Sequence, residues 1–418
     1  MAAFEPARVA VIDLADPIPP LAGRGPDGRW HQRVVALVRL DDRPLGVADL
    51  PIGTGLGPAG VAEALSAALG DELAARLELP RPIPVPVGGL GRSTGPRCPD
   101  RAATVVVATR DRPNELARCL DSLAHLEHDR FDVVVVDNAP SDDRAEVVVE
   151  RFRGTSLPVR YVREPRPGLA RAHNAARPHV TGEVVAVTDD DVAVDRAWLR
   201  RLTDAFGEAP SVGAVTGMIF PAELETAAQA WTDVHAAYNK GYERRVVDLD
   251  ADPTSLLPWA TGAIGSGANM AFSAAALDDI GWFDDALGAG TPARGGDDLA
   301  AFHDVLVHGH RIVYEPSAVV FHHHHRDARV VRDLTFSYGV ALGAHLTRSV
   351  LDHPSAVGAL LPRLPAGLRH GARVTRRPRT SPVPGLQGTT WRQRAGVLAG
   401  PWSYARSRRW ARATGVAA

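Results

Sequence analysis

Short apolar runs alternate with segments of helical spacing over residues 104–187, and this alternation limits the folds open to the chain. Four runs rich in β-branched residues predict strands at 104–108, 132–136, 159–162 and 184–187. Between them, apolar spacing predicts helices at 115–126, 142–152 and 169–176. Continuous apolar runs are typical of strands buried on both faces of a parallel sheet. Together, these elements indicate a doubly wound α/β sheet, which binds ligands at the carboxyl ends of its strands.

Polar residues follow three of the four predicted strands. They are Thr109, Arg110, Asp111 and Arg112 after the first, Asp137 and Asn138 after the second, and Asp189, Asp190 and Asp191 after the fourth. Carboxylates in one cleft repel one another unless a cation lies among them, and oxygen ligands suit Mg²⁺ or Mn²⁺. The pattern favours a nucleotide-diphosphate site. The alternative is that each acidic segment is a turn or a solvated loop that caps a helix.

The order of these motifs resembles that of a known enzyme family. TVVVATRDRP, VVVVDNAPSDD, PGLARAHNAA and VVAVTDDDV resemble the nucleotide-binding half of the family 2 glycosyltransferases. A glycine–asparagine stretch, GWFDD, an acidic pair and a histidine-rich strand end continue the resemblance, which covers about residues 102–345. It implies the GT-A fold, in which a doubly wound, mostly parallel sheet has a nucleotide-binding half and an acceptor half.

The resemblance also implies roles for individual residues. The expected donor-binding residues are Thr109, Arg112, Asp137, Arg171, Asp189 and Asp190. Among them, Asp137 would accept a hydrogen bond from a ring N–H of uracil or thymine. Asp189 and Asp191 match the outer residues of a DxD motif, in which Asp191 is the expected metal ligand and Asp190 the alternative. Arg171 belongs to a segment that closes over the donor in the family.

The acidic pair Asp297–Asp298 supplies the expected catalytic residue. In the family the second member is the base, so Asp298 would remove a proton from the acceptor hydroxyl as that oxygen attacks the anomeric carbon. A metal acting as a Lewis acid would stabilise the departing nucleoside diphosphate. Because the pair precedes a helix expected at 299–308, the alternative is that both aspartates only cap it.

Four consecutive histidines close the last strand candidate of this half. His322 matches the family histidine that completes the metal shell, and in an extended strand it would share a face with His324. A zinc site is the alternative. The glycines of residues 262–267 would let the backbone approach the donor sugar, or form a flexible loop. Residues 223–248 are expected to be a helix, whose aromatic side chains face the acceptor or the core.

The ends of the chain differ from this central region. Residues 1–79 predict a small α+β domain with strands at 33–40 and 45–50 and a helix at 58–77, and residues 80–101 predict a proline- and glycine-rich linker. Residues 346–418 form an arginine-rich region expected to be helical, next to a helix expected at 335–351. From Arg363 onward the chain has twelve arginines and no acidic residue, so the net charge of −2 leaves −14 for the preceding part.

That asymmetry predicts either contact of residues 363–412 with an anionic membrane surface or a tail that is solvated or folded onto the acidic remainder. No recognition module precedes the tail, so nucleic acid is not an expected partner. Two cysteines exclude a disulfide framework, and the N-terminus lacks the pattern of a signal peptide. The sequence has no run of eighteen apolar residues, so we predict no membrane span. We expect a cytoplasmic protein, either free in the cytoplasm or attached peripherally to the inner face of the membrane.

The predicted function is therefore inverting transfer of a sugar from a UDP, dTDP or GDP donor, dependent on Mn²⁺ or Mg²⁺. The expected acceptor is a saccharide, a lipid-linked glycan, a natural product or a peptide. One alternative is a sugar-nucleotide nucleotidyltransferase, which would need a glycine-rich loop where this chain has TRDRPNE. The other is a catalytically silent scaffold that binds nucleotide sugars, against which Asp191 and Asp298 argue.

Overall fold

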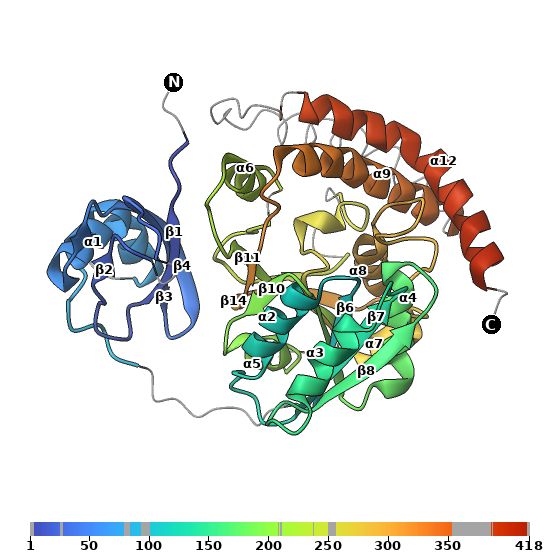
Figure 1. Ribbon diagram of the computed structural model, residues 1–418, viewed down its shortest axis with the longest axis horizontal. Helices are drawn as coiled ribbons and strands as arrows, with labels where there is room; N and C mark the ends of the chain where they lie inside the picture. The colour runs from blue at the N-terminus through green and yellow to red at the C-terminus, as the bar shows by residue number, and fades with distance from the viewer. Residues whose placement is uncertain are drawn as a thin grey trace. The chain divides into compact units, whose positions relative to one another are not determined.

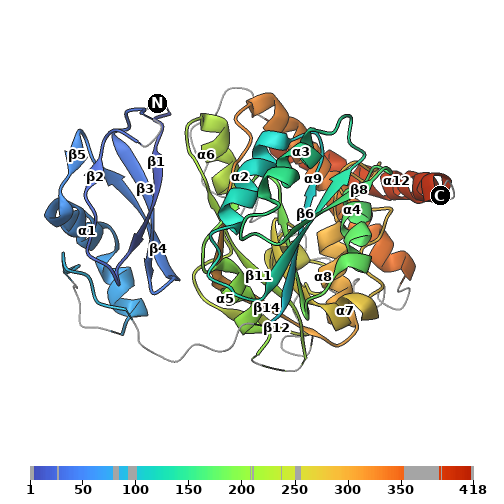
Figure 2. The ribbon, with the colours of Figure 1, turned by 60° about the horizontal axis from the view of Figure 1, so that its bottom comes forward.

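The computed structural model describes residues 4–25, 28–78, 84–92, 101–207, 209, 211–236, 238–249, 256–352, 386 and 388–415 (Figures 1 and 2). The chain forms two compact units. The smaller contains Met1–Pro99, Phe220–Glu243 and His323–Arg326, and the larger contains Asp100–Ile219, Arg244–His322 and Asp327–Ala418.

A nine-stranded sheet forms the centre of the larger unit. Parallel pairings join four strands in the spatial order β8 (Val159–Glu164), β7 (Phe131–Asn138), β6 (Ala103–Thr109) and β9 (Val184–Asp189). The sheet continues with β13 (Asn269–Ser273), β11 (Val212–Pro221), β14 (Arg311–His322) and β10 (Val192–Val194), and β12 (Arg245–Val247) pairs with β14. Strand β13 pairs antiparallel with β9 and β11, and β14 pairs antiparallel with β10 and β12. The predicted α/β class, with a parallel nucleotide-binding half, is confirmed.

The register of the parallel strands brings the polar strand ends together. Thr109 pairs with Asp137 across β6 and β7, and Ala108 pairs with Asp189 across β6 and β9. The prediction that these residues share one edge of the sheet is therefore confirmed.

Helices cover the sheet and separate it from solvent. They are α2 (Pro113–Leu123), α3 (Arg144–Phe152), α4 (Leu169–Ala176), α5 (Trp198–Ala205), α7 (Ala274–Asp279) and α8 (Asp297–Val307), with 3₁₀ turns η1 (Arg177–His179) and η2 (Thr261–Ala263). Helix α4 packs on β6, β7 and β8, whereas α5 packs on β9 and β14. The helix expected at 299–308 is α8, which begins two residues earlier than expected, at the acidic pair itself.

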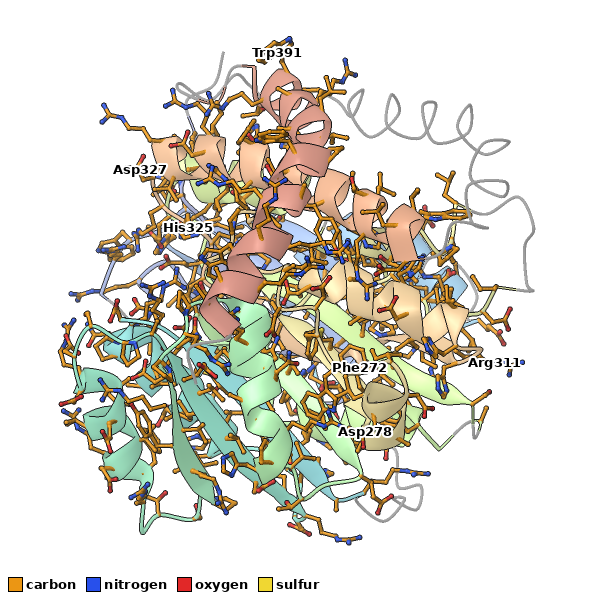
Figure 3. The ribbon with its side chains drawn as sticks, turned by 90° about the vertical axis from the view of Figure 1, so that its right-hand side faces the viewer. Phe272, Asp278, Arg311, His325, Asp327 and Trp391 are labelled. Carbon is orange, nitrogen blue, oxygen red and sulfur yellow. The ribbon has the colours of Figure 1, made fainter. Side chains whose placement is uncertain are left out.

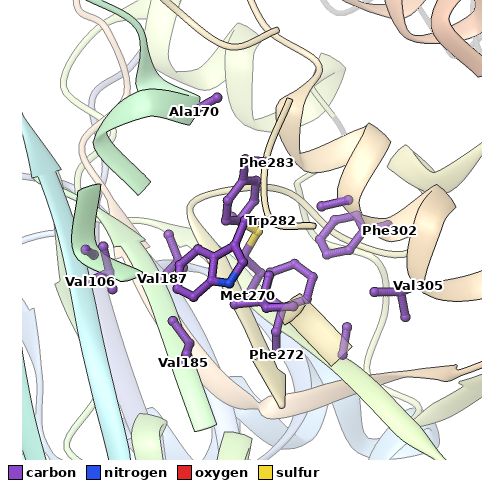
Figure 4. Packing of buried hydrophobic residues seen from close by; sticks show 14 of the residues in the cluster. Val106, Ala170, Val185, Val187, Met270, Phe272, Trp282, Phe283, Phe302 and Val305 are labelled. Atoms are coloured by element: carbon purple, nitrogen blue, oxygen red, sulfur yellow. The ribbon is translucent and has the colours of Figure 1, made fainter. Parts of the chain in front are cut away.

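One apolar core joins the nucleotide-binding half to α8 (Figure 4). Phe272 of β13 stacks on Phe302 of α8, with ring centroids 5.9 Å apart, and meets Phe283 edge-on at 5.8 Å. Val106 and Val134, from β6 and β7, belong to the same cluster. The helix that carries the acidic pair is therefore packed on the same core as the strands that carry the other acidic residues.

The C-terminal region contains two long helices that lie side by side, α9 (Ala328–Asp352) and α12 (Thr389–Gly415) (Figure 1). Four glycines meet where they cross, Gly339 and Gly343 of α9 and Gly396 and Gly400 of α12. A Cβ atom on any of them would collide with the backbone of the other helix. Helix α9 runs through the domain boundary expected after residue 345. No helix in the described part of the chain is both long and apolar enough to cross a membrane.

The smaller unit has a three-stranded sheet of β1 (Arg8–Asp13), β3 (Arg33–Leu40) and β4 (Arg43–Pro51), covered by α1 (Pro58–Arg76), and a short ladder of β2 (Leu21–Ala22) with β5 (Gly55–Leu56). This unit also contains α6 (Ala227–His235). His31 Nε2 lies 2.8 Å from a carboxylate oxygen of Glu225, which anchors the segment before α6. From the expected linker, Val85 is buried in this core, while residues 79–83 and 93–100 lie outside the described residues.

The helix expected at 223–248 is wrong in its extent. Thr226 and Gln229 form a capping box that begins α6, which ends at His235. Further on, Gly241 has a φ of +108°, which a helix does not allow, and its N–H donates to the Asn239 side chain. The chain then pairs with β14 as the short strand β12.

Candidate active site

Asp189, Asp191 and His322 meet at the carboxyl edge of the sheet. Asp189 ends β9, and the residue after Asp191 pairs with His322 across β10 and β14. One ligand atom from each of the three residues lies within 4.8 Å of the others, and His322 Nε2 is 3.3 Å from Asp191 Oδ1. That oxygen is buried and has no hydrogen-bond partner among the residues that the structure describes. Two carboxylates and one imidazole fit a divalent cation such as Mg²⁺ or Mn²⁺, and Asp191 Oδ1 is the buried oxygen that such a cation would bind.

The electrostatics of the triplet Asp189–Asp191 agree with such a site. Burial, and then the charges of Asp191 and Asp190, raise the pKa of Asp189 well above its ordinary value. Burial also raises the pKa of Asp190 to about 6, although Arg112 opposes the shift. Carboxylates held this closely are stabilised by a cation placed among them.

Asp190 has different partners from its two neighbours. Its carboxylate accepts hydrogen bonds from Thr109 Oγ1 at 2.8 Å and from Arg112 Nη1 at 3.1 Å. The same Arg112 nitrogen donates to Asp191 at 3.0 Å. The structure therefore brings Thr109 and Arg112 to the triplet, and it groups Asp191 rather than Asp190 with Asp189 and His322.

Asp137 is fully buried and uses only one of its carboxylate oxygens. Tyr161 of β8 donates its hydroxyl to Oδ2 at 2.9 Å, while Oδ1 has no hydrogen-bond partner among the described residues. Burial raises the pKa of Asp137, and the hydrogen bond from Tyr161 opposes the rise. Sequence reasoning missed Tyr161, although its place in the strand beside Asp137 was a usable signal.

Arg171 makes its contacts with the C-terminal region. It is 1% exposed, and its Nη2 donates to the carbonyl of Ala411 in α12 at 2.9 Å. Its guanidinium carbon lies 4.7 Å from the centre of the Trp410 ring, and its Nε lies 3.4 Å from Asp285. These contacts fix α4 against α12. Donor binding by Arg171 stays a prediction.

The acidic pair Asp297–Asp298 begins α8. Asp298 is partly buried, and its Oδ2 accepts the Gly267 N–H at 2.9 Å while Oδ1 accepts the Leu299 N–H at 2.8 Å. Asp297 is buried, and burial together with the charge of Asp298 raises its pKa. The glycine-rich stretch thus reaches the predicted base through Gly267. Asp298 thus also accepts a backbone N–H of the first turn of its own helix, whose N-cap residue is Gly296.

The expected alternation of the four histidines along a strand is wrong beyond the first. Strand β14 ends at His322, and the three following histidines lie outside the sheet. Of the four, His322 is grouped with Asp189 and Asp191. The ring of His324 instead stacks with Tyr238, with ring centroids 5.5 Å apart.

Comparisons with known proteins show which family and which relatives this chain is similar to. The model of the family described as "Glycosyl transferase family 2" matches residues 104–256. The "Pre-mycofactocin glycosyltransferase" of Mycobacterium tuberculosis is 28% identical over 231 residues, which cover 55% of this chain and 44% of that protein. The chain thus spans less than half the length of this relative. "Succinoglycan biosynthesis protein ExoM" of Rhizobium meliloti is 35% identical over 118 residues, covering 27% and 37%.

Among solved structures, the mannosyltransferase PcManGT from Pyrobaculum calidifontis, in complex with GDP-Man and Mn²⁺, aligns with a TM-score of 0.44. It is 21% identical, and the alignment covers 78% of this chain and 80% of that one. A score at this level carries no argument about the site, which rests on the residues described above. The residues that match the family 2 glycosyltransferase model, 104–256, include the acidic strand ends Asp137, Asp189 and Asp191.

Proposed function

We propose that the chain transfers a sugar from a nucleotide-diphosphate donor to an acceptor hydroxyl, with inversion at the anomeric carbon. The observation that carries this proposal is the grouping of Asp189, Asp191 and His322 at the strand ends, beside Thr109 and Arg112. A divalent cation, Mn²⁺ or Mg²⁺, would be held by these three residues and would neutralise the charge of the leaving diphosphate. Arg112 would add a second positive charge next to the phosphates.

The donor base would lie at Asp137. Its free Oδ1 can accept a hydrogen bond from a ring N–H, while Tyr161 holds the other oxygen. Uracil, thymine and guanine all carry such an N–H, so the candidate donors are UDP-, dTDP- and GDP-sugars. Acceptor candidates are a saccharide, a lipid-linked glycan, a natural product or a peptide.

Asp298 would act as the base. Its carboxylate is held by the Gly267 N–H and lies at the positive end of the α8 dipole, which favours the ionised form. An ionised carboxylate takes the proton from the acceptor hydroxyl as its oxygen bonds to the anomeric carbon. The bond from that carbon to the diphosphate breaks in the same step. The opposite-face attack accounts for inversion.

We further propose a cytoplasmic location. Cys119, the free cysteine among the described residues, is buried, and burial raises the pKa of its thiol. A protonated, buried thiol is compatible with a reducing compartment and contributes packing rather than reactivity.

The test is thermal unfolding of the full chain with UDP-, dTDP- and GDP-sugars, each with Mn²⁺, Mg²⁺ or chelator. A ligand that binds only the native state raises the melting temperature by an amount set by its concentration relative to Kd. We expect one nucleotide to give a metal-dependent shift that is lost in Asp191→Ala. Hydrolysis or transfer assays with that donor then test the enzyme. A shift without transfer to any acceptor would favour the scaffold, and no shift with any donor would overturn the proposal.

A further inference from the structure

Helix α12 buries two glycines and exposes three large apolar residues. Gly396 and Gly400 are buried against α9. In contrast, the exposed fractions of Trp391, Leu398 and Trp402 are 73%, 84% and 77%. These three residues are spaced by seven and four positions, so they lie on one face of the helix. Figure 3 shows Trp391 at the outer side of α12, pointing away from the rest of the unit.

The outer face of α12 differs from that of an ordinary surface helix. Such a helix turns its apolar stripe inward and its polar residues outward. Apolar side chains gathered on an outward face mark an interaction site. The inward face of α12 is already occupied by α9, so the second apolar face requires a different partner.

The charges around the stripe indicate the chemistry of that partner. Helix α12 has six arginines and no acidic residue. Exposed arginines on or beside the stripe are Arg394, Arg406, Arg409 and Arg412, all within about 60° of Trp391 on a helix of 3.6 residues per turn. The apolar residues occupy the first half of the helix, and three of these arginines occupy the second half. A surface of this kind complements one that is both apolar and anionic.

We propose that the outer face of α12 binds in the plane of an anionic lipid bilayer. Tryptophan side chains favour the boundary between headgroups and acyl chains, where Trp391, Leu398 and Trp402 would insert. The flanking arginines would bind the phosphates of anionic headgroups. A second copy of the chain fits less well, because pairing two such faces would bring arginines together without acidic partners. The proposal is independent of the catalytic one.

The experiment is co-sedimentation of the full chain with vesicles of phosphatidylcholine, alone or mixed with phosphatidylglycerol, at low and high salt. We expect binding to the mixed vesicles only, a blue shift of tryptophan fluorescence, and weakening by salt. Replacing all three apolar residues, in Trp391→Ser/Leu398→Ser/Trp402→Ser, should reduce partitioning at least about tenfold. Arg406→Gln/Arg409→Gln/Arg412→Gln should reduce it by about a hundredfold, since each charge near the surface contributes about a factor of five.

The matched control is Trp30→Ser, which removes a tryptophan that is 67% exposed in the smaller unit. It should leave partitioning unchanged. Because all substituted side chains face outward, each variant should keep the circular dichroism and melting temperature of the unmodified chain. Equal binding by the apolar triple variant, or no binding to anionic vesicles, overturns the proposal. The proposal would also be overturned if the unmodified chain formed a dimer without vesicles and the apolar triple variant were a monomer. That result would identify the face as a contact between copies of the chain.

Discussion

Two acidic clusters of the larger unit are held in contrasting ways. The triplet Asp189–Asp191 follows a buried strand, and Thr109, Arg112 and His322 surround it with hydroxyl, guanidinium and imidazole groups. The acidic pair Asp297–Asp298 begins a helix, and Asp298 accepts hydrogen bonds from the backbone N–H groups of Gly267 and Leu299. The first environment gathers like charges that a cation stabilises. In the second, backbone N–H groups at the start of a helix hold the Asp298 carboxylate in place.

The largest expected effect separates the chemistry of the two clusters. Asp298→Asn removes the proton acceptor but keeps the shape and the Gly267 hydrogen bond. We expect transfer to fall by about 10³-fold, within the range for a lost general base. The metal-dependent donor shift in melting temperature should persist. Loss of that shift would mean that the pair takes part in holding the donor, and the contrast between the clusters would fail.

The next effect concerns the anchor of the helix that carries the pair. Asp304 of α8 is buried and bonded to His303 and to Arg348 of α9. Burial alone would raise the pKa of Asp304, but these hydrogen bonds outweigh it and lower the pKa from 3.8 to about 2. Asp304→Asn leaves the Arg348 charge without this partner, so we expect it to lower the free energy of unfolding by about 3 kcal/mol. Urea denaturation measures this loss.

The same group predicts a dependence on pH. Because the folded pKa lies below the unfolded value, the ionised carboxylate stabilises the fold above about pH 4. This contribution, about 2 kcal/mol by the size of the shift, is lost as the pH falls through about 2. Asp304→Asn should therefore flatten the acid limb of the stability curve. An unchanged acid limb would show that Asp304 is not ionised in the fold.

A smaller effect tests the triplet from within. Asp191→Asn should raise the apparent Kd for the cation by about 10- to 100-fold, the range for loss of a residue that supports a metal site. The metal-dependent rise in melting temperature with the donor should weaken accordingly. Asp190→Asn should do less to the metal dependence, because Asp190 bonds to Thr109 and Arg112. Titration of the cation at fixed donor concentration measures both variants. A larger effect from Asp190→Asn would assign the ligand role to that residue instead.

The smallest effect concerns the base of the donor. Tyr161→Phe removes one hydrogen bond of 2.9 Å to Asp137 without changing its packing. A bond of this kind contributes about 1 kcal/mol, so we expect KM for the donor to rise several-fold with kcat nearly unchanged. Steady-state kinetics with the donor varied gives both values. A fall in kcat at unchanged KM would place Tyr161 outside the donor site.

Much of the parallel half was predictable because its signals are local. A run such as 132–136 predicts a buried strand. The residue after the run lies at the edge of the sheet, whatever the order of the neighbouring strands. The bonds that orient Asp137 and Asp304 were not predictable. Tyr161 acts through the register of β7 and β8, and Arg348 acts from a helix 44 residues further along the chain.

The sequence by itself determined the α/β class, the acidic strand ends and an arginine-rich region without acidic residues. Each depends on residue type and on spacing within a few positions. Only the tertiary structure decided which oxygens of the triplet meet His322, and that Arg171 is buried beneath Trp410. It also decided that α12 turns Gly396 and Gly400 inward and Trp391 outward. Helical periodicity arranges side chains around an axis, but the face that is buried depends on the neighbour that packs against it.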